Sequence, residues 1–141
     1  MPKTAKTADR KVVLIVEDSV DFSNLLKFIV EDEGFEGLQF PLQLDDICGY
    51  AKEHGVSSVL MDLALGRKGG MAYIEMLKND PETAALPIVI ITGRDLPMKE
   101  ILELQSKGIT YLRKGRVEMG DIRKGIVEAA SHEPASRRKK K

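Results

Sequence analysis

The chain has 141 residues, no net formal charge, and 43% apolar and 31% charged side chains, which is the balance of one ordinary water-exposed domain. No apolar run approaches the roughly 20 residues that span a bilayer, and the N-terminus carries no apolar signal segment. We therefore expect a cytoplasmic protein without a membrane span. The single cysteine, Cys48, excludes an internal disulfide and an all-cysteine metal site, and we expect it to be a small buried residue in a helix.

The charges are distributed unevenly along the chain. Residues 11–136 hold 14 basic and 21 acidic side chains, whereas residues 137–141 are all basic. An acidic domain is not expected to wrap DNA over its face, because contacts to phosphates need Lys and Arg there. We expect one domain at 11–130 between flexible basic ends at 1–10 and 131–141, although a basic tail can also contact an acidic partner, nucleic acid or a membrane.

The first half of the domain alternates between strand and helix patterns. An apolar run over 11–16 predicts a buried strand, and Ser19 and Gly34 are placed to cap and to end the helix that follows it. The apolar residues of this helix recur at three- and four-residue spacing: Phe22, Leu25, Leu26, Ile29 and Val30. A weaker strand over 35–40 stops at Pro41, and an irregular helix is expected over about 43–54, ended by Gly55.

The second half repeats this alternation three times. Residues 56–62 predict the third strand, and a glycine-rich loop at 66–70 leads into a helix closed by Asn79-Asp80-Pro81. The fourth strand is expected at 87–92, followed by a helix over about 97–107 that ends at Gly108. A short fifth strand at 109–112 precedes a last helix that starts near Arg116 and fades before Pro134.

Strict alternation of strands and helices indicates βαβ units, whose right-handed crossovers build a parallel sheet with helices on both faces. The fold class is therefore α/β, a flavodoxin-like (βα)5 doubly wound parallel sheet with strand order 2-1-3-4-5. The switch point of this topology lies between strands 1 and 3, and ligands bind there at the carboxyl ends of the strands.

Three carboxylates follow the two strands at this switch point. Glu17 and Asp18 come directly after the first strand, and Asp62 comes directly after the third. Three converging negative charges with no obvious partner in the local sequence repel one another and call for a cation. The sequence therefore predicts a divalent metal site.

Two further residues fall at the same edge of the predicted sheet, namely Thr92 at the end of strand 4 and Lys114 just past strand 5. The separations are 44 residues from Asp18 to Asp62, 30 from Asp62 to Thr92, and 22 from Thr92 to Lys114, and Tyr111 stands three residues before the lysine. In these positions and spacings, residues 11–130 resemble the response-regulator receiver domain of two-component signalling and are similar to its chemotaxis regulators.

The resemblance implies a role for each of these residues. Asp62 would accept a phosphoryl group from a histidine kinase or a phosphotransfer protein, assisted by Lys114 and Thr92. Mg²⁺ would be held by Glu17, Asp18, Asp62 and the backbone carbonyl of Ala64. Thr92 and Tyr111 would form the switch, which would act on a downstream protein through the face of the fourth helix, fifth strand and fifth helix. The domain would catalyse only its own phosphorylation and dephosphorylation.

The sequence departs from the family pattern at four positions. Gly115 stands after the lysine and Gly66 stands four residues after Asp62, where the family commonly has proline. Ala64 and Arg94 occupy the positions that tune dephosphorylation in the family. Alanine cannot hold an attacking water and Arg94 could shield or pair with the phosphate, so we hypothesise a long-lived phosphoryl group.

Three other functions are compatible with parts of the pattern. The chain could be a receiver-like interaction module that is not phosphorylated, or an aspartyl-phosphate phosphohydrolase, although Ala64 replaces the second acid that such enzymes carry. A flavodoxin is disfavoured because Glu17 and Asp18 would repel the phosphate of a flavin. No DNA-binding domain follows the last helix, so we expect a stand-alone receiver or one excised from a longer protein.

Overall fold

Short aliphatic segments form a five-stranded parallel sheet in the order β2-β1-β3-β4-β5. The computed structural model describes residues 10–65 and 69–131, and this sheet is the one that those residues contain. The predicted α/β class and the strand order 2-1-3-4-5 are thus confirmed. The strands are β1 (Val12–Val16), β2 (Glu36–Gln39), β3 (Val56–Met61), β4 (Ile88–Thr92) and β5 (Ile109–Arg113).

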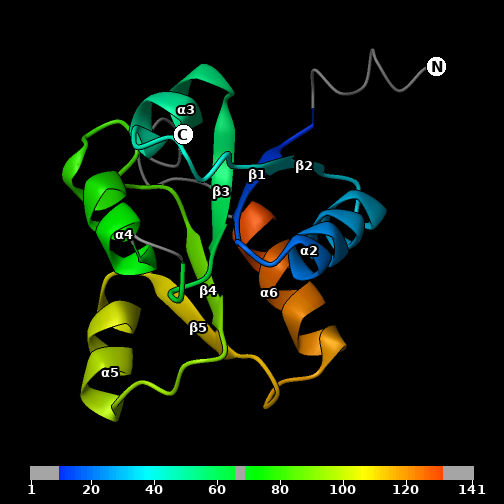
Figure 1. Cartoon of the computed structure of the whole chain (residues 1–141), viewed down its shortest axis with the longest axis vertical. Helices are drawn as coiled ribbons and strands as arrows, with labels where there is room; N and C mark the ends of the chain where they lie inside the picture. The colour runs from blue at the N-terminus through cyan, green and yellow to red at the C-terminus, as the bar shows by residue number, and fades with distance from the viewer. Residues whose placement is uncertain (1–9, 66–68, 132–141) are drawn as a thin grey trace, which may run out of the picture.

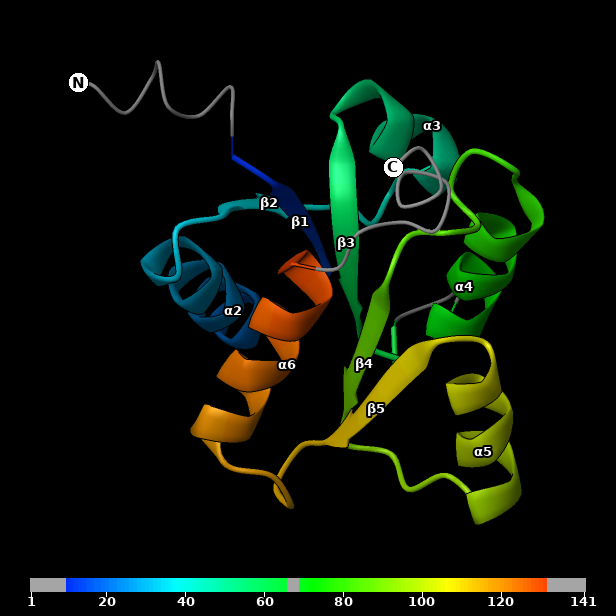
Figure 2. The same cartoon turned by 180° about the vertical axis from the view of Figure 1, so that it is seen from behind.

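A helix follows each strand, and the helices cover both faces of the sheet (Figure 1 and Figure 2). One face is covered by α2 (Val20–Asp32) and α6 (Met119–Ser131). The other is covered by α3 (Ile47–Glu53), α4 (Gly70–Asn79) and α5 (Met98–Ser106). No helix in the described part of the chain is long and apolar enough to cross a membrane.

The core consists of two apolar layers, one on each side of the central strands. All five residues of β1 and of β4 are buried, because these strands have a neighbour on each side and helices above and below. Alternate residues of one strand enter different layers: Leu14 packs toward α3 and α4, and Ile15 packs toward α2 and α6. Cys48 is buried in α3, as predicted.

The predicted caps of the first helix are confirmed. Ser19 precedes α2, and its hydroxyl oxygen accepts a hydrogen bond from the Phe22 N–H at 3.3 Å. Gly34 follows the helix with a φ of +93°, which a residue with a side chain rarely adopts. The helix start therefore lies directly after the Glu17-Asp18 pair, and the cap holds the pair close to the end of β1.

Two helices start later than predicted. The second begins at Ile47 rather than near residue 43, because Asp46 caps it by accepting the Gly49 N–H at 2.8 Å. The last begins at Met119 rather than near Arg116, because a turn at the end of β5 intervenes, in which the Arg116 N–H donates to the Arg113 carbonyl at 3.0 Å. The predictions for Gly66 and for residues 1–9 and 132–141, which include Pro134, lie outside the described residues.

Candidate functional site

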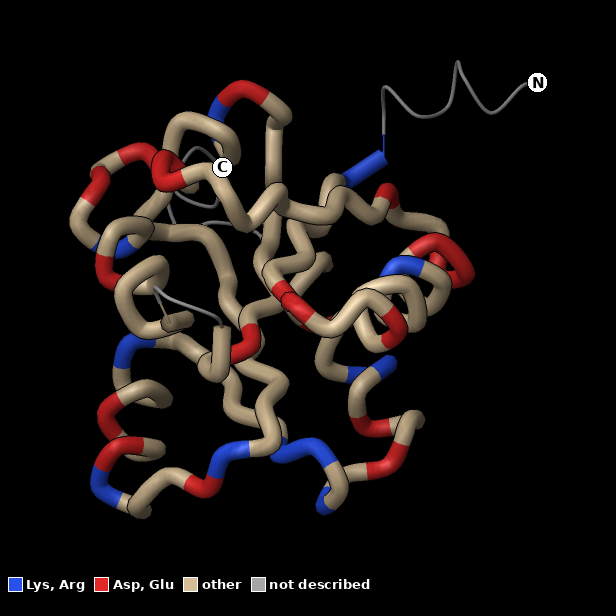
Figure 3. The backbone as a smooth tube through the Cα atoms, in the orientation of Figure 1, with Lys and Arg blue, Asp and Glu red and all other residues tan. Residues whose placement is uncertain are grey.

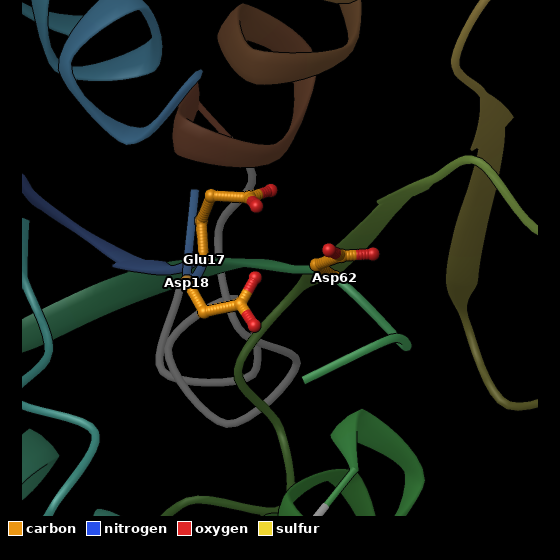
Figure 4. A group of neighbouring side chains, drawn as sticks. All are labelled: Glu17, Asp18 and Asp62. Atoms are coloured by element: carbon orange, nitrogen blue, oxygen red, sulfur yellow. The ribbon is translucent and has the colours of Figure 1, made fainter. Parts of the chain in front are cut away.

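The three predicted carboxylates converge at the carboxyl ends of β1 and β3 (Figure 4). One oxygen of each of Glu17, Asp18 and Asp62 lies within 4.8 Å of the others, and this is the one such acidic cluster among residues 10–65 and 69–131. The strands set this geometry, because Val16 pairs with Met61 and the Asp62 N–H donates to the Val16 carbonyl at 3.0 Å. Glu17 and Asp62 are 8% and 5% exposed, whereas Asp18 faces solvent.

Lys114 brings one positive charge into the cluster. Its backbone N–H donates to the Thr92 carbonyl at 2.8 Å, which extends the pairing of β4 and β5 by one residue. The ammonium nitrogen lies 3.1 Å from Oε1 of Glu17 and 3.7 Å from Oδ2 of Asp62. Two of the three carboxylates, Glu17 and Asp62, thus have a positively charged partner that the local sequence does not show.

Glu17 is the carboxylate that this crowding affects most clearly. Burial raises its pKa above the ordinary value, and the nearby charge of Asp62 raises it further. A hydrogen bond from the Ser19 N–H, 3.0 Å from Oε2, and the Lys114 ammonium oppose this increase without cancelling it. The ionised form of Glu17 therefore needs additional positive charge, and a bound cation would supply it.

The two predicted switch residues are joined through the backbone of Arg94. The Thr92 side chain is completely buried, and its hydroxyl oxygen accepts the Arg94 N–H at 3.3 Å. The Tyr111 hydroxyl donates to the Arg94 carbonyl at 2.6 Å. Parallel pairing of Ile90 with Tyr111 brings the tyrosine to this loop. Arg94 itself is exposed and lines a groove of about 350 Å³ with residues of α4 and α5.

The loop after Asp62 is held close to the Asp62 side chain. The Ala64 N–H donates to Oδ1 of Asp62 at 3.2 Å, and the Gly70 N–H donates to the Leu63 carbonyl at 3.1 Å. A Cβ atom on Gly70 would overlap the Asp62 carbonyl oxygen and the Leu63 backbone, so this position requires glycine. The start of α4 thereby fixes the backbone from which the Asp62 side chain projects.

Gly115 gives the Lys114 loop a path that proline could not follow. Its φ is +85°, in the left-handed region, whereas the proline ring fixes φ near −65°. No cis peptide bond occurs in the described residues, so the Lys114–Gly115 bond is trans. This departure from the family pattern therefore changes the backbone beside the lysine.

Phe22 is a neighbour of the site that the sequence pattern did not predict. In the sequence it is only one of the apolar residues that recur along the first helix. Its ring centroid lies 4.2 Å from the Lys114 ammonium nitrogen. Nothing in the helical periodicity distinguishes this residue from the other apolar residues of α2. The contact arises because the turn after β5 brings Lys114 over the first turn of α2.

The fold and the site together match a known family. The model of the response regulator receiver domain matches residues 13–125, so the chain belongs to the response-regulator receiver domain family. Receiver domains are the signalling modules of two-component systems, and the resemblance drawn from the sequence is confirmed at the level of the family.

Individual relatives cover different parts of the chain. The polar-differentiation response regulator DivK of Brucella ovis is 30% identical over 83 residues, which are 59% of this chain and 67% of DivK. The phosphate regulon transcriptional regulatory protein PhoB of Klebsiella pneumoniae is 24% identical over 102 residues, 72% of this chain and 44% of PhoB. The chain thus spans less than half of PhoB.

Among solved structures, the Mn(2+)-bound form of response regulator Rcp1 matches with a TM-score of 0.62 and 21% identity, covering 88% of this chain and 98% of Rcp1. At this identity the likeness shows the fold. Receiver domains bind a divalent metal at an acidic cluster, and the donors of this chain suit such an ion. They are hard carboxylate oxygens that lie within 4.8 Å of one another, and divalent cations such as Mg²⁺ prefer ligands of this kind.

Proposed function

We propose that the protein is a phosphorylation-dependent switch of a two-component system, in which Asp62 accepts a phosphoryl group from a histidine kinase or a phosphotransfer protein. The observation that carries this proposal is the position of Lys114, whose ammonium lies between Glu17 and Asp62 at an acidic cluster. A carboxylate with a cation beside it and room for a metal has the charge environment that phosphoryl transfer requires.

The metal of this proposal is Mg²⁺, held by Glu17, Asp18, Asp62 and the backbone carbonyl of Ala64. When bound, it would supply positive charge that offsets the negative charge of the acceptor carboxylate and of the incoming phosphoryl group. Exposure of Asp18 leaves one side of the cluster open to water, which Mg²⁺ retains in part. The raised pKa of Glu17 supports the same assignment, because this carboxylate lacks sufficient positive charge in the protein alone.

Asp62 acts as the nucleophile. One of its oxygens forms a bond to phosphorus as the bond from phosphorus to the donor breaks. Acetyl phosphate then releases acetate, and phosphohistidine releases its imidazole side chain, which takes up a proton. Hydrogen bonds from the Asp62 N–H to β1 and from the Ala64 N–H to Oδ1 hold the carboxylate in place. Lys114 neutralises charge on the transferred group, and the Thr92 hydroxyl donates to one of its oxygens.

The output face consists of α5, β5 and α6. Thr92 and Tyr111 bond the N–H and the carbonyl of Arg94 respectively, so a change of partner at Thr92 would alter the support of the loop that leads into α5. On α5, Met98 and Leu102 expose 66% and 56% of their surface, as expected of a face that a downstream protein contacts.

The test is phosphorylation by acetyl phosphate with Mg²⁺, followed by intact mass. We expect the mass gain of one phosphoryl group, its loss in Asp62→Asn, and its retention in Asp46→Asn, a matched change that preserves the cap of α3. No gain, or a gain that survives in Asp62→Asn, would overturn the proposal and favour an unphosphorylated interaction module. Turnover of p-nitrophenyl phosphate would indicate a phosphohydrolase instead.

A further inference from the structure

The contact between Phe22 and Lys114 belongs to no role assigned so far. Phe22 lies in the first turn of α2 and Lys114 in the turn between β5 and α6, on the side of the sheet where these two helices are adjacent (Figure 2). The ammonium nitrogen is 4.2 Å from the ring centroid, well inside the range of about 6 Å for a cation–π contact. The Phe22 ring is partly buried against the apolar layer below α2.

This contact completes a closed set of interactions that links Glu17 to the first turn of α2 and to Lys114. Oε2 of Glu17 accepts the Ser19 N–H at 3.0 Å, and the Ser19 hydroxyl oxygen accepts the Phe22 N–H at 3.3 Å. The Lys114 ammonium, which faces the Phe22 ring, donates to the other oxygen of Glu17 at 3.1 Å. The Ser19 cap of α2, the Phe22 side chain and Lys114 therefore help to position one another.

An aromatic ring suits this position because it attracts the ammonium without adding a charge or a strong hydrogen-bond acceptor. A carboxylate there would compete for Lys114 and add to the excess of negative charge. An aliphatic side chain would fill the space but would not attract the ammonium. The flexible four-carbon stem of Lys114 would then be free to turn toward solvent. The ring attracts the ammonium wherever it moves over the face, so Lys114 can change partners without leaving the site.

We propose that Phe22 is a positioning residue for Lys114, holding its ammonium beside Asp62 while the lysine exchanges Glu17 for an oxygen of the transferred phosphoryl group. This inference rests on the proposed function. It assigns Phe22 no contact with the reacting atoms, since its effect passes entirely through Lys114.

The first test compares initial rates of phosphorylation by acetyl phosphate with Mg²⁺, a donor small enough that no partner protein docks. We expect Phe22→Leu to lower the rate about two- to tenfold and Phe22→Trp to preserve or raise it. Phe28→Leu is the matched control, because Phe28 lies on the same helix, is 62% exposed and should leave the rate unchanged.

Two further measurements separate positioning from a structural role. Trifluorinated phenylalanine at position 22 keeps the shape of the ring and weakens its negative face, so the rate should fall even though folding is preserved. In a Lys114→Met background, Phe22→Leu should have no further effect on the rate. An unchanged rate with the fluorinated ring, or an equal loss in both backgrounds, would overturn the proposal.

Failure of this inference is distinguishable from failure of the proposed function. Wild-type protein that gains no phosphoryl group contradicts the proposed function, whereas normal phosphorylation of both Phe22→Leu and the fluorinated protein contradicts only the role of Phe22. A double-mutant cycle of Phe22 and Lys114 in urea unfolding needs no phosphorylation. We expect a coupling of about two- to fivefold in the unfolding equilibrium, and zero coupling would refute the contact itself.

Discussion

Removing one charge from the acidic cluster should stabilise the metal-free protein. In Asp62→Asn the amide keeps the shape of the side chain and its ability to accept the Ala64 N–H, but the repulsion from Glu17 and Asp18 disappears. At a separation of at most 4.8 Å and an effective dielectric constant of 20, each repulsion is at least about 3.5 kcal/mol. The attraction lost at 3.7 Å from Lys114 is about 4.5 kcal/mol on the same scale. The difference leaves a calculated stabilisation of about 2.5 kcal/mol for Asp62→Asn. Solvent around the exposed Asp18 weakens its repulsion, so we expect the free energy of unfolding to rise by about 1 kcal/mol.

The assay is urea unfolding at pH 7, once with a chelator and once with Mg²⁺. With the chelator, Asp62→Asn should unfold at a higher urea concentration than the wild type, whereas Glu75→Gln, a change at an exposed acid on α4, should unfold with the wild type. Mg²⁺ at ten times its dissociation constant should stabilise the wild type by about 1.4 kcal/mol and the variant by much less. A variant that is less stable than the wild type in chelator would refute the electrostatic argument.

Three other predictions follow from the same geometry. Because burial raises the folded-state pKa of Glu17, its contribution to stability is fully present below the unfolded pKa and is lost as pH rises through the folded pKa. In chelator, Glu17→Gln should remove this loss of stability, which urea unfolding measures as the pH is raised from below the ordinary pKa of the carboxyl group. Gly70→Ala should lower the free energy of unfolding by about 1–3 kcal/mol, whereas Gly120→Ala, in open space on α6, should raise it by up to about 1 kcal/mol. Equal urea midpoints for the two variants would contradict the close approach at Gly70. If Ala64 and Arg94 slow hydrolysis, the phosphoryl group should persist for minutes or longer in Mg²⁺ buffer by intact mass, and a half-life of seconds would reject the idea.

The fold was predictable because its signals are local. Each strand is a short apolar run, and the central strands are buried on both faces, so their sequences need not alternate. Helix ends were less predictable where a side chain or turn outside the apolar pattern decides them. Asp46 delays α3, and the turn at Gly115 delays α6. These are capping and backbone effects that periodicity does not register.

The candidate site was predictable in its residues but not in its contacts. Strand ends bring Glu17 and Asp62 together, because neighbouring parallel strands end at the same edge of the sheet. The ion pair between Glu17 and Lys114 joins residues 97 positions apart, and its geometry depends on the turn after β5. The position of Phe22 depends on the same turn, so no spacing in the sequence could have indicated it. Acidic and basic residues are interspersed along the described backbone (Figure 3), so the distribution of charged residues alone does not mark this site either.

The two hydrogen bonds to the backbone N–H and carbonyl of Arg94 set a limit on how strong a signal could pass from Thr92 to Tyr111. Hydrogen bonds of this kind contribute about 0.5–1.5 kcal/mol each, so exchanging both of them shifts a two-state equilibrium by about 1–3 kcal/mol. Such a coupling changes the affinity for a downstream partner about 5- to 150-fold. If the proposed phosphorylation signals only through these two hydrogen bonds, we expect a graded output, with a fraction of the molecules in the active conformation before phosphorylation.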